Sequence, residues 1–321
     1  MTQRIDRALT LEIVRVTEQA AIAASKLRGR GHEKAADQAA VDSMRTELNK
    51  LPISGRIVIG EGERDEAPML FIGEEVGTGG AEVDIAVDPL EGTTICAKAM
   101  PGALAVMALA PRGTLLNAPD IYMNKIAVGP GYQDGLVDLD LSPEENLGRL
   151  AEAKGVPVGE LTACILDRPR HQELINAVRD AGAAVRLIGD GDIAGVIDTT
   201  HAGETGVDIY MGIGGAPEGV LAAAALRCIG GQIQCRLHPM KPEDRTRAAA
   251  IVEDVDRKYT RDELASADAI FSATGVTTGS MLQGVKTTPG SITTDTVVMR
   301  AATGTVRRIT TEHRKTAAMG S

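Results

Sequence analysis

The sequence predicts a mixed α/β protein of two lobes, and three observations support this class. The chain has 321 residues, 43% of them apolar, which is enough for roughly two domains with buried cores. Helical and strand-like patterns alternate from about residue 144, which favours a largely parallel, helix-covered sheet in the second lobe. With 36 Gly, 2 Phe and no Trp, the core must consist of small aliphatic side chains around closely approaching backbone.

The first 130 residues predict two helices followed by short strands. Residues 9–28 carry apolar side chains at roughly 3.6-residue spacing, which predicts a long helix ending before Gly29. A second helix is predicted over 34–50 and is stopped by Pro52, and Asp37 lies beside its apolar stripe, where it can face inward. Strands are predicted for four short apolar runs bounded by turn residues: 56–59, 83–87, 103–110 and 122–128.

The rest of the chain predicts the alternating elements of the second lobe. Helices are expected over 144–154, 170–181, 192–199, 217–228 and 242–258. Strands are expected over 161–166, 184–188, 207–212, 232–236 and 269–273, followed by a hairpin over 293–311 that is interrupted at Gly304. Because no low-complexity linker separates the two patterns, we expect one rigid unit: an N-terminal α+β lobe over 1–155 and a C-terminal α/β lobe over 156–321.

Charge and composition exclude several classes of protein. The net charge of −10 argues against nucleic acid as a partner. The four cysteines show no CxxC spacing, which predicts buried free thiols in a reducing compartment. The longest apolar run, 220–226, is far shorter than the roughly 20 residues of a membrane helix, so we expect a cytoplasmic protein with no membrane segment.

Two acidic turns follow predicted strands and indicate a metal site. Asp88 and Glu91 lie in the run DPLEGTT, where carboxylates can hold hard cations and the backbone N–H groups and threonines that follow can contact phosphate oxygens. Upstream, the run GEGERD contains three closely spaced carboxylates, Glu61, Glu63 and Asp65. Such carboxylates repel one another unless solvent or a cation screens them. The alternatives are an ordinary capping turn and a solvated charged loop.

A glycine-rich turn, GIGGAPEG over 212–219, connects a predicted strand to a predicted helix. The glycines permit a tight turn, Pro217 suits the first helical turn, and the Glu218 carboxylate can face back toward the strand end. A dinucleotide-binding turn is the alternative, although the spacing does not match G-x-G-x-x-G, and no P-loop motif occurs.

Two further strand ends carry residues suited to a sugar phosphate. The run RPRH over 168–171 offers two arginines for phosphate, or it is simply the basic start of a surface helix. The run GDGD over 189–192 offers carboxylates to sugar hydroxyls or to the next helix as caps. No metal-spaced histidine pair and no G-x-S-x-G occurs, so carboxylate-bound Mg²⁺ or Mn²⁺ is favoured over a Ser or Cys nucleophile.

Together these motifs resemble those of class II fructose-1,6-bisphosphatases, which belong to the lithium-sensitive, metal-dependent sugar phosphatases. Seven stretches between about Leu11 and Arg308 carry the resemblance: IVIGEGERDEAPML, DIAVDPLEGTT, APDIYMNKIAVGP, LDRPRH, DGD, GIGGAPEG and IFSATGVTTG. The resemblance implies a layered αβαβα fold and hydrolysis of fructose 1,6-bisphosphate to fructose 6-phosphate and phosphate, as in gluconeogenesis. Alternatives are sedoheptulose 1,7-bisphosphatase activity, an inositol or sugar monophosphatase, a nucleotide-dependent oxidoreductase and a noncatalytic sugar-phosphate binding protein.

The resemblance also implies which residues act. It assigns Mn²⁺ or Mg²⁺ to four carboxylates: Asp37, Glu61, Asp88 and Glu218. It assigns substrate contacts to a larger set: Glu91, Gly92, Thr93, Tyr122, Arg168, Pro169, Arg170, Asp190, Gly191, Asp192 and Gly215. Thr93, with Asp37 or Glu61, would orient and deprotonate the attacking water, and Asp65 would be an auxiliary acid. The expected partner is a small sugar bisphosphate, and the expected assembly is a homo-oligomer, a dimer or a tetramer.

Overall fold

The computed structural model describes residues 4–61 and 69–314, and the chain divides into two compact units. Unit 1 comprises residues 1–112 and 268–321, and unit 2 comprises residues 113–267. This division differs from the expected boundary at 155/156, which lies inside unit 2. The reason is strand pairing across the sequence: Ile270 pairs with Leu109, so the C-terminal segment completes the sheet that the N-terminal segment begins.

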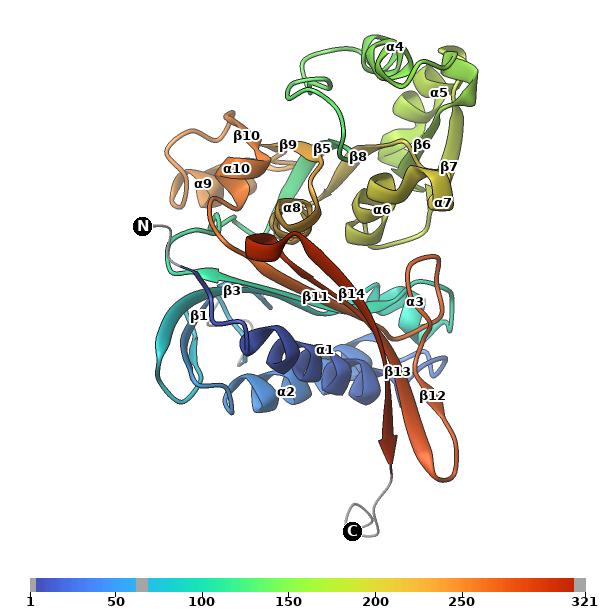
Figure 1. The fold of residues 1–321 in the computed structure, drawn as a ribbon. Helices are drawn as coiled ribbons and strands as arrows, with labels where there is room; N and C mark the ends of the chain where they lie inside the picture. Colours follow the sequence, from blue (N-terminus) through green and yellow to red (C-terminus); the bar gives the residue numbers. More distant parts are fainter. Residues whose placement is uncertain (1–3, 62–68, 315–321) are drawn as a thin grey trace. The chain divides into compact units, whose positions relative to one another are not determined.

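Unit 1 is built on an eight-stranded sheet of order β12-β13-β11-β4-β3-β1-β2, with β14 added beside β13. Its strands are β1 (Ile53–Ile59), β2 (Glu75–Val76), β3 (Ala81–Glu91), β4 (Leu104–Pro111), β11 (Ile270–Gly275), β12 (Lys286–Thr287), β13 (Ser291–Arg300) and β14 (Thr305–Arg314). Only β1 and β3 pair in parallel among the described strands of this sheet. The predicted C-terminal hairpin is confirmed as β13 and β14, joined through Gly304 (Figure 1).

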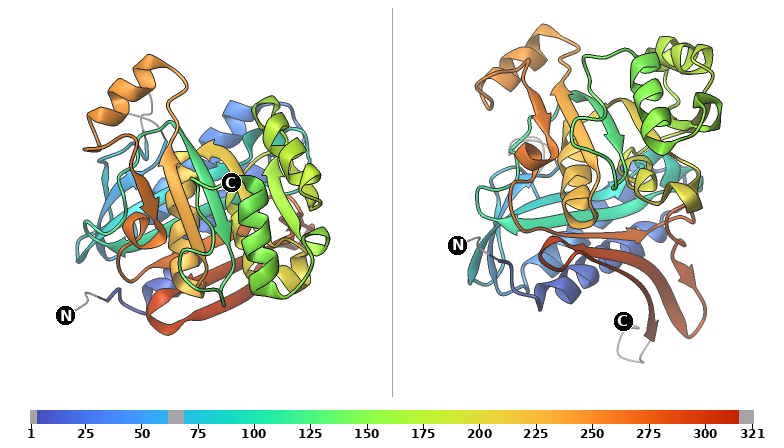
Figure 2. Two further views of the ribbon diagram at one scale, coloured as in Figure 1. Left: turned by 90° about the horizontal axis from the view of Figure 1, so that it is seen from above. Right: turned by 45° about the horizontal axis from the view of Figure 1, so that its top comes forward.

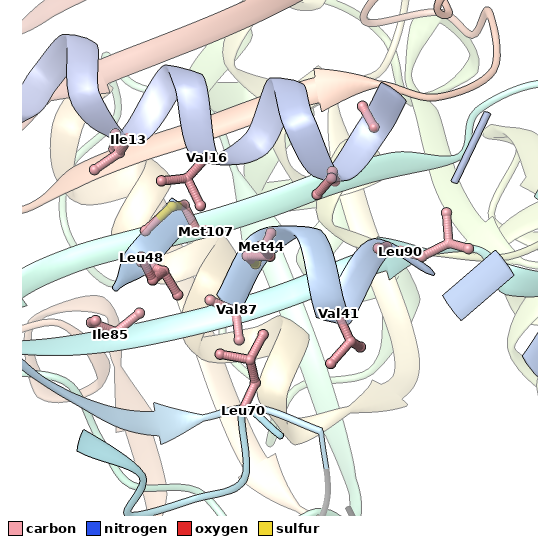
Figure 3. Close-up of a cluster of buried hydrophobic side chains, with 14 of the residues drawn as sticks. Ile13, Val16, Val41, Met44, Leu48, Leu70, Ile85, Val87, Leu90 and Met107 are labelled. Carbon is pink, nitrogen blue, oxygen red and sulfur yellow. The ribbon is translucent and has the colours of Figure 1, made fainter. Parts of the chain in front are cut away.

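Two long helices, α1 (Leu9–Ser25) and α2 (Glu33–Leu48), pack together against one face of this sheet (Figure 1). Their apolar stripes bury Ile13 and Met44 completely beside the sheet residue Ile85, and Figure 3 shows this core. Both predicted helices are confirmed, each to within a few residues. A short helix, α3 (Thr93–Ala97), follows β3 and packs against α2.

Unit 2 is built on a six-stranded sheet of order β10-β9-β5-β8-β6-β7. Its strands are β5 (Tyr122–Val128), β6 (Thr162–Leu166), β7 (Ala184–Ile188), β8 (Ile209–Gly215), β9 (Gln232–Leu237) and β10 (Lys258–Thr260). Four of them, β6 to β9, run in one direction, as the alternation predicts. However, β5 lies between β8 and β9 antiparallel to both (Figure 2), so the sheet is mixed and the expected, largely parallel sheet is wrong. Periodicity after residue 144 could not reveal this, because β5 precedes that segment.

The helices of unit 2 follow the predicted order, with one correction and two short helices, α7 and α10, that the sequence did not predict. They are α4 (Pro143–Lys154), α5 (Gln172–Asp180), α6 (Ile193–Asp198), α7 (Ala202–Thr205), α8 (Ala216–Ile229), α9 (Pro242–Ala249) and α10 (Arg261–Leu264). The helix expected over 242–258 ends at Ala249, and the residues that follow include a turn, in which the Asp254 side chain accepts the N–H of Asp256, before β10 begins at Lys258.

Two predictions from composition can be compared with the structure. All four cysteines are buried and free, as predicted. None of the helices within residues 4–61 and 69–314 is long and apolar enough to cross a membrane.

Candidate active site

One edge of the unit 1 sheet gathers the acidic turns. Because β1 and β3 are parallel neighbours, their carboxyl ends lie at the same edge, where Glu61 follows β1 and Asp88 and Glu91 end β3. The register of β3 against β4 shifts between Asp88 and Glu91, and Asp88 Oδ1 accepts the N–H of Leu90 at 3.1 Å. The sequence predicted a turn from Asp88 onward, whereas β3 continues through this irregularity to Glu91 and the turn comes at Gly92.

The turn leads directly into α3. Gly92 has φ 84°, in the left-handed region that glycine adopts without strain, and Thr93 is the first residue of the helix. Glu91 is buried, whereas Asp88 and Thr93 are partly exposed. Thr93 therefore lies at the acidic edge as a partly exposed residue.

Asp37 reaches the same unit from a different element. It lies on α2, which packs against both β3 and α3, and burial raises the pKa of its carboxyl group. Glu61 is held through its backbone, because its N–H donates to the carbonyl of Leu70 at 2.9 Å. Asp65 lies outside the described residues.

The predicted metal ligands are divided between the units: Asp37, Glu61 and Asp88 belong to unit 1, and Glu218 belongs to unit 2. In the part of the chain that the structure describes, no three Asp, Glu, His or Cys side chains gather closely enough to hold a metal ion. The ligand set accordingly stays a prediction.

One edge of the unit 2 sheet gathers the second set of predicted residues. The parallel strands β6, β7 and β8 end at this edge, and β5 begins there because Tyr122 pairs with Gly215. The edge therefore brings together eight residues predicted to contact substrate: Tyr122, Arg168, Pro169, Arg170, Asp190, Gly191, Asp192 and Gly215.

The two arginines at this edge are held in place by the protein. The Arg170 guanidinium lies 4.7 Å from the centre of the Tyr122 ring and donates to the carbonyl of Ile213 at 2.7 Å. Arg168 donates to the carbonyl of Gly189 and to Asp190 Oδ1, the latter at 2.8 Å. These contacts fix the direction of both side chains before any ligand arrives.

His171 supports the arginine turn from inside. It is 1% exposed, its Nδ1 lies 2.7 Å from the carbonyl of Leu166, and its Nε2 accepts the N–H of Ile213 at 2.8 Å. This pattern requires a neutral ring with the proton on Nδ1. Burial lowers the pKa of His171, which favours the same neutral form.

A buried charged cluster, missed in the sequence, lies beneath this edge. Lys125, Asp192 and Tyr210 are each at most 2% exposed. Asp192 Oδ1 accepts from Lys125 Nζ at 2.8 Å, and Asp192 Oδ2 accepts from the hydroxyl of Tyr210 at 2.7 Å. Both oxygens of Asp192 are engaged inside the protein, although the residue was predicted to contact substrate. We call these three residues the Lys125 cluster.

The Lys125 cluster is electrostatically connected to Glu218. Burial lowers the pKa of Lys125, but attraction by Asp192 and Glu218 outweighs this effect, so the pKa is raised and the lysine stays charged. Burial raises the pKa of Glu218, and the charge on Lys125 opposes that shift. Glu218 Oε2 is shielded from solvent and has no hydrogen-bond partner among the described residues. A shielded carboxylate oxygen of this kind fits a ligand for a hard divalent cation.

The glycines of the GIGG run, at the end of β8, have a specific structural use. A Cβ atom on Gly214 would lie 2.1 Å from Asp192 Oδ2, and one on Gly215 would lie 2.0 Å from Glu218 Oε2. These glycines therefore make room for two carboxylates beside β8. The sequence placed these glycines in a turn, whereas they are the last residues of β8, which leads directly into α8.

The acidic and arginine-bearing sheet edges, on a mixed α/β fold, suit a phosphatase of sugar phosphates, and the family comparison shows this class. The model of the family "Bacterial fructose-1,6-bisphosphatase, glpX-encoded" matches residues 7–313, and the chain belongs to this family. It is therefore a hydrolase of the fructose-bisphosphatase type, as its motifs predict. Membership implies a divalent metal and a sugar bisphosphate substrate, and it does not support the oxidoreductase or the noncatalytic alternative.

Curated relatives agree with this assignment. The chain is 46% identical over 338 residues to the D-fructose 1,6-bisphosphatase class 2/sedoheptulose 1,7-bisphosphatase of Synechococcus sp. (strain JA-3-3Ab), with 97% of each chain covered. It is 44% identical over 337 residues to the protein of the same name from Synechococcus elongatus, covering 96% of this chain and 97% of the relative. Among solved structures, extragenic suppressor protein suhB from Bartonella henselae is 17% identical, with TM-score 0.34, covering 61% of this chain and 74% of that chain.

Proposed function

We propose a division of labour for the hydrolysis of fructose 1,6-bisphosphate: unit 1 serves the phosphate that is cleaved, and unit 2 binds the phosphate that is not. The observation that carries this proposal is the fixed position of the Arg170 guanidinium. It lies over the Tyr122 ring and donates to the carbonyl of Ile213. Both bonds to Ile213 come from Nε and Nη2, and no described residue accepts from Nη1. A fixed guanidinium with a remaining donor suits a phosphate oxygen.

Four carboxylates would hold Mn²⁺ or Mg²⁺: Asp37, Glu61, Asp88 and Glu218. Their oxygens are the hard donors that both ions prefer, and the shielded Oε2 of Glu218 supports the inclusion of that residue. When bound, a divalent ion neutralises phosphate oxygens and lowers the pKa of a coordinated water.

The remaining steps belong to residues of unit 1. The hydroxyl group of Thr93 orients the attacking water, and Asp37 or Glu61 accepts its proton. Asp65 acts as an auxiliary acid. Glu91, Gly92 and the backbone N–H groups after them contact the scissile phosphate.

In unit 2, the side chain of Asp192 has a supporting role. Lys125 and Tyr210 already occupy its two oxygens, so the contact between the 190–192 turn and the sugar falls to Asp190 and to backbone groups. Arg168, paired with Asp190, holds this turn beside the 168–171 run.

Substrate breadth and assembly extend this proposal. Because the relatives carry a double name, we include sedoheptulose 1,7-bisphosphate as a second substrate. We retain a cytoplasmic homo-oligomer, a dimer or a tetramer, as the expected state.

The test is phosphate release from fructose 1,6-bisphosphate, sedoheptulose 1,7-bisphosphate and fructose 6-phosphate, with Mn²⁺, with Mg²⁺ and after chelation. Release from both bisphosphates that ends on chelation is expected. Unchanged turnover after exhaustive chelation contradicts the metal assignment. Equal rates on the monophosphate contradict a binding site for the second phosphate.

A further inference from the structure

The segment that returns to the unit 1 sheet after Glu61 is anchored by a buried carboxylate, Glu74. This side chain is 6% exposed. Its Oε1 accepts from Nε of Arg45 on α2 at 2.5 Å, and its Oε2 accepts from the backbone N–H of Leu70. One carboxylate thus joins the helix to the returning segment.

Leu70 connects this anchor to Glu61. Its carbonyl accepts the N–H of Glu61 at 2.9 Å, and a Cβ atom on the preceding Gly60 would lie 2.0 Å from the same oxygen. Leu70 has φ 54°, in the left-handed region that costs a non-glycine residue free energy and persists only where the surroundings enforce it. Its side chain is fully buried in the core cluster that includes Val41 and Met44 of α2 (Figure 3).

These contacts form a continuous path from α2 to Glu61. Arg45 starts it on the helix that also carries Asp37, Glu74 and Leu70 continue it, and the N–H of Glu61 ends it. The two ends of the path are therefore the elements that carry two proposed metal ligands. Two further backbone bonds, from Gly73 to Ile57 and from Ile57 to Glu74, keep the returning segment beside β1.

We propose that Glu74 is a positioning residue for divalent metal binding, because it fixes the backbone at Glu61 relative to α2, which carries Asp37. The inference rests on the proposed function, in which Asp37 and Glu61 are metal ligands. Groups that orient metal ligands without touching the metal typically contribute about 10- to 100-fold to metal affinity. Nothing in the motifs singled out Glu74, since it lies in an ordinary acidic pair with Glu75.

The Glu74→Gln variant tests this role. An amide of the same size offers one acceptor oxygen, so either Arg45 or the N–H of Leu70 loses its partner. The dissociation constant of Mn²⁺, measured by calorimetry on the metal-depleted full chain, should rise about 10- to 100-fold. The kcat at saturating Mn²⁺ should change far less, because the ligands themselves are intact.

The neighbouring Glu75→Gln is the matched control. Glu75 also pairs with an arginine, since its Oε1 lies 3.1 Å from Nη1 of Arg112, but its side chain is 60% exposed and makes no described contact with Leu70. This variant carries the same charge change and should leave the Mn²⁺ dissociation constant unchanged. A purely structural role for Glu74 would lower the Tm of the metal-free protein without changing Mn²⁺ affinity, and that result overturns the proposal.

Two more variants complete the test. Arg45→Met removes one half of the anchor at a side chain that is 40% exposed, so it keeps the proposal testable if Glu74→Gln does not fold, and it should weaken Mn²⁺ binding by a smaller factor. Glu61→Gln should lose Mn²⁺ binding outright. If Glu61→Gln loses it while Glu74→Gln and Arg45→Met keep the wild-type affinity, the positioning role alone is overturned. If Glu61→Gln binds Mn²⁺ normally, the proposed ligand set and the inference built on it both fall.

Discussion

Asp37 in unit 1 and Asp192 in unit 2 are both carboxylates that the sequence placed at the site, yet their surroundings differ. Asp192 is buried against Lys125 and Tyr210, which occupy both of its oxygens. Asp37 is partly buried, its pKa is raised by burial, and no lysine or arginine within 4–61 or 69–314 forms an ion pair with it. Unit 2 therefore neutralises its carboxylate internally, whereas the described residues of unit 1 provide no such cation for Asp37, and our proposal assigns a metal ion to that role.

The largest expected effect falls on the internally neutralised carboxylate. Lys125→Met leaves the charge of Asp192 buried without its cation, which should lower the free energy of unfolding by about 3–5 kcal/mol. Urea unfolding measures this loss. Adding Asp192→Asn should recover part of the stability, and Lys258→Met, which breaks partly exposed pairs with Asp138 and Asp140, should cost about 1 kcal/mol or less. A loss no larger than that of Lys258→Met would contradict the comparison.

At the acidic edge of unit 1 we expect a large loss of activity with little loss of stability. Asp88→Asn keeps an oxygen for the N–H of Leu90, so the metal-free protein should unfold at nearly the wild-type temperature. The kcat should nevertheless fall at least ~100-fold, equivalent to about 2.7 kcal/mol of transition-state stabilisation. Retention of the wild-type rate would remove Asp88 from the site.

A smaller effect should separate the two phosphates of the substrate. Arg170→Ala removes a charge-assisted contact worth about 1.5–3 kcal/mol, so KM for fructose 1,6-bisphosphate should rise roughly 10- to 100-fold with less change in kcat. A small monophosphate substrate should be affected little. The control is Arg245→Ala, which breaks a surface pair with Asp256 on the segment around α9. Equal losses on both substrates would assign Arg170 to the cleaved phosphate or to the fold.

The smallest effect concerns pH and His171. Because its pKa is lowered from 6.5 in the folded protein, the unfolded chain takes up a proton first as the solution is acidified. The stability that His171 contributes is thus present above about pH 6.5 and is lost as pH falls through the lowered pKa. Tm measured from pH 7.5 to 5 should fall more steeply for the wild type than for His171→Gln. Parallel curves would mean that the ring is not held neutral.

Local pattern was sufficient to predict most elements but not how the chain divides. The hydrophobic spacing of α1 and α2 and the apolar runs of β5 and β7 gave nearly the observed bounds, because these features depend on near neighbours. The pairing of β4 with β11 joins residues about 160 positions apart. No local pattern records which distant strand completes a sheet.

Residue type and spacing were sufficient to place the Asp88 run and the arginine pair at strand ends, where the structure has them, and their roles in the site stay predictions. Lys125 was missed, because a single lysine in an apolar strand resembles a solvent-facing position. Its burial depends on Gly214 and Gly219, which β8 and α8 bring against its side chain. Only the fold makes that proximity visible.

The pairing of β4 with β11 also has a consequence for synthesis of the chain. β4 is buried at every position in the finished sheet, yet the strand that covers its free side emerges only after all of unit 2 has been made. At roughly 5–20 residues per second, the ribosome would need on the order of 10–30 s to synthesise the residues between β4 and β11. During that interval the nascent chain presents an open apolar strand edge, the kind of surface to which chaperones and other unfinished chains bind. Unit 2 is one continuous segment and can fold first. The sheet of unit 1, by contrast, is complete only after the last fifth of the chain has been synthesised.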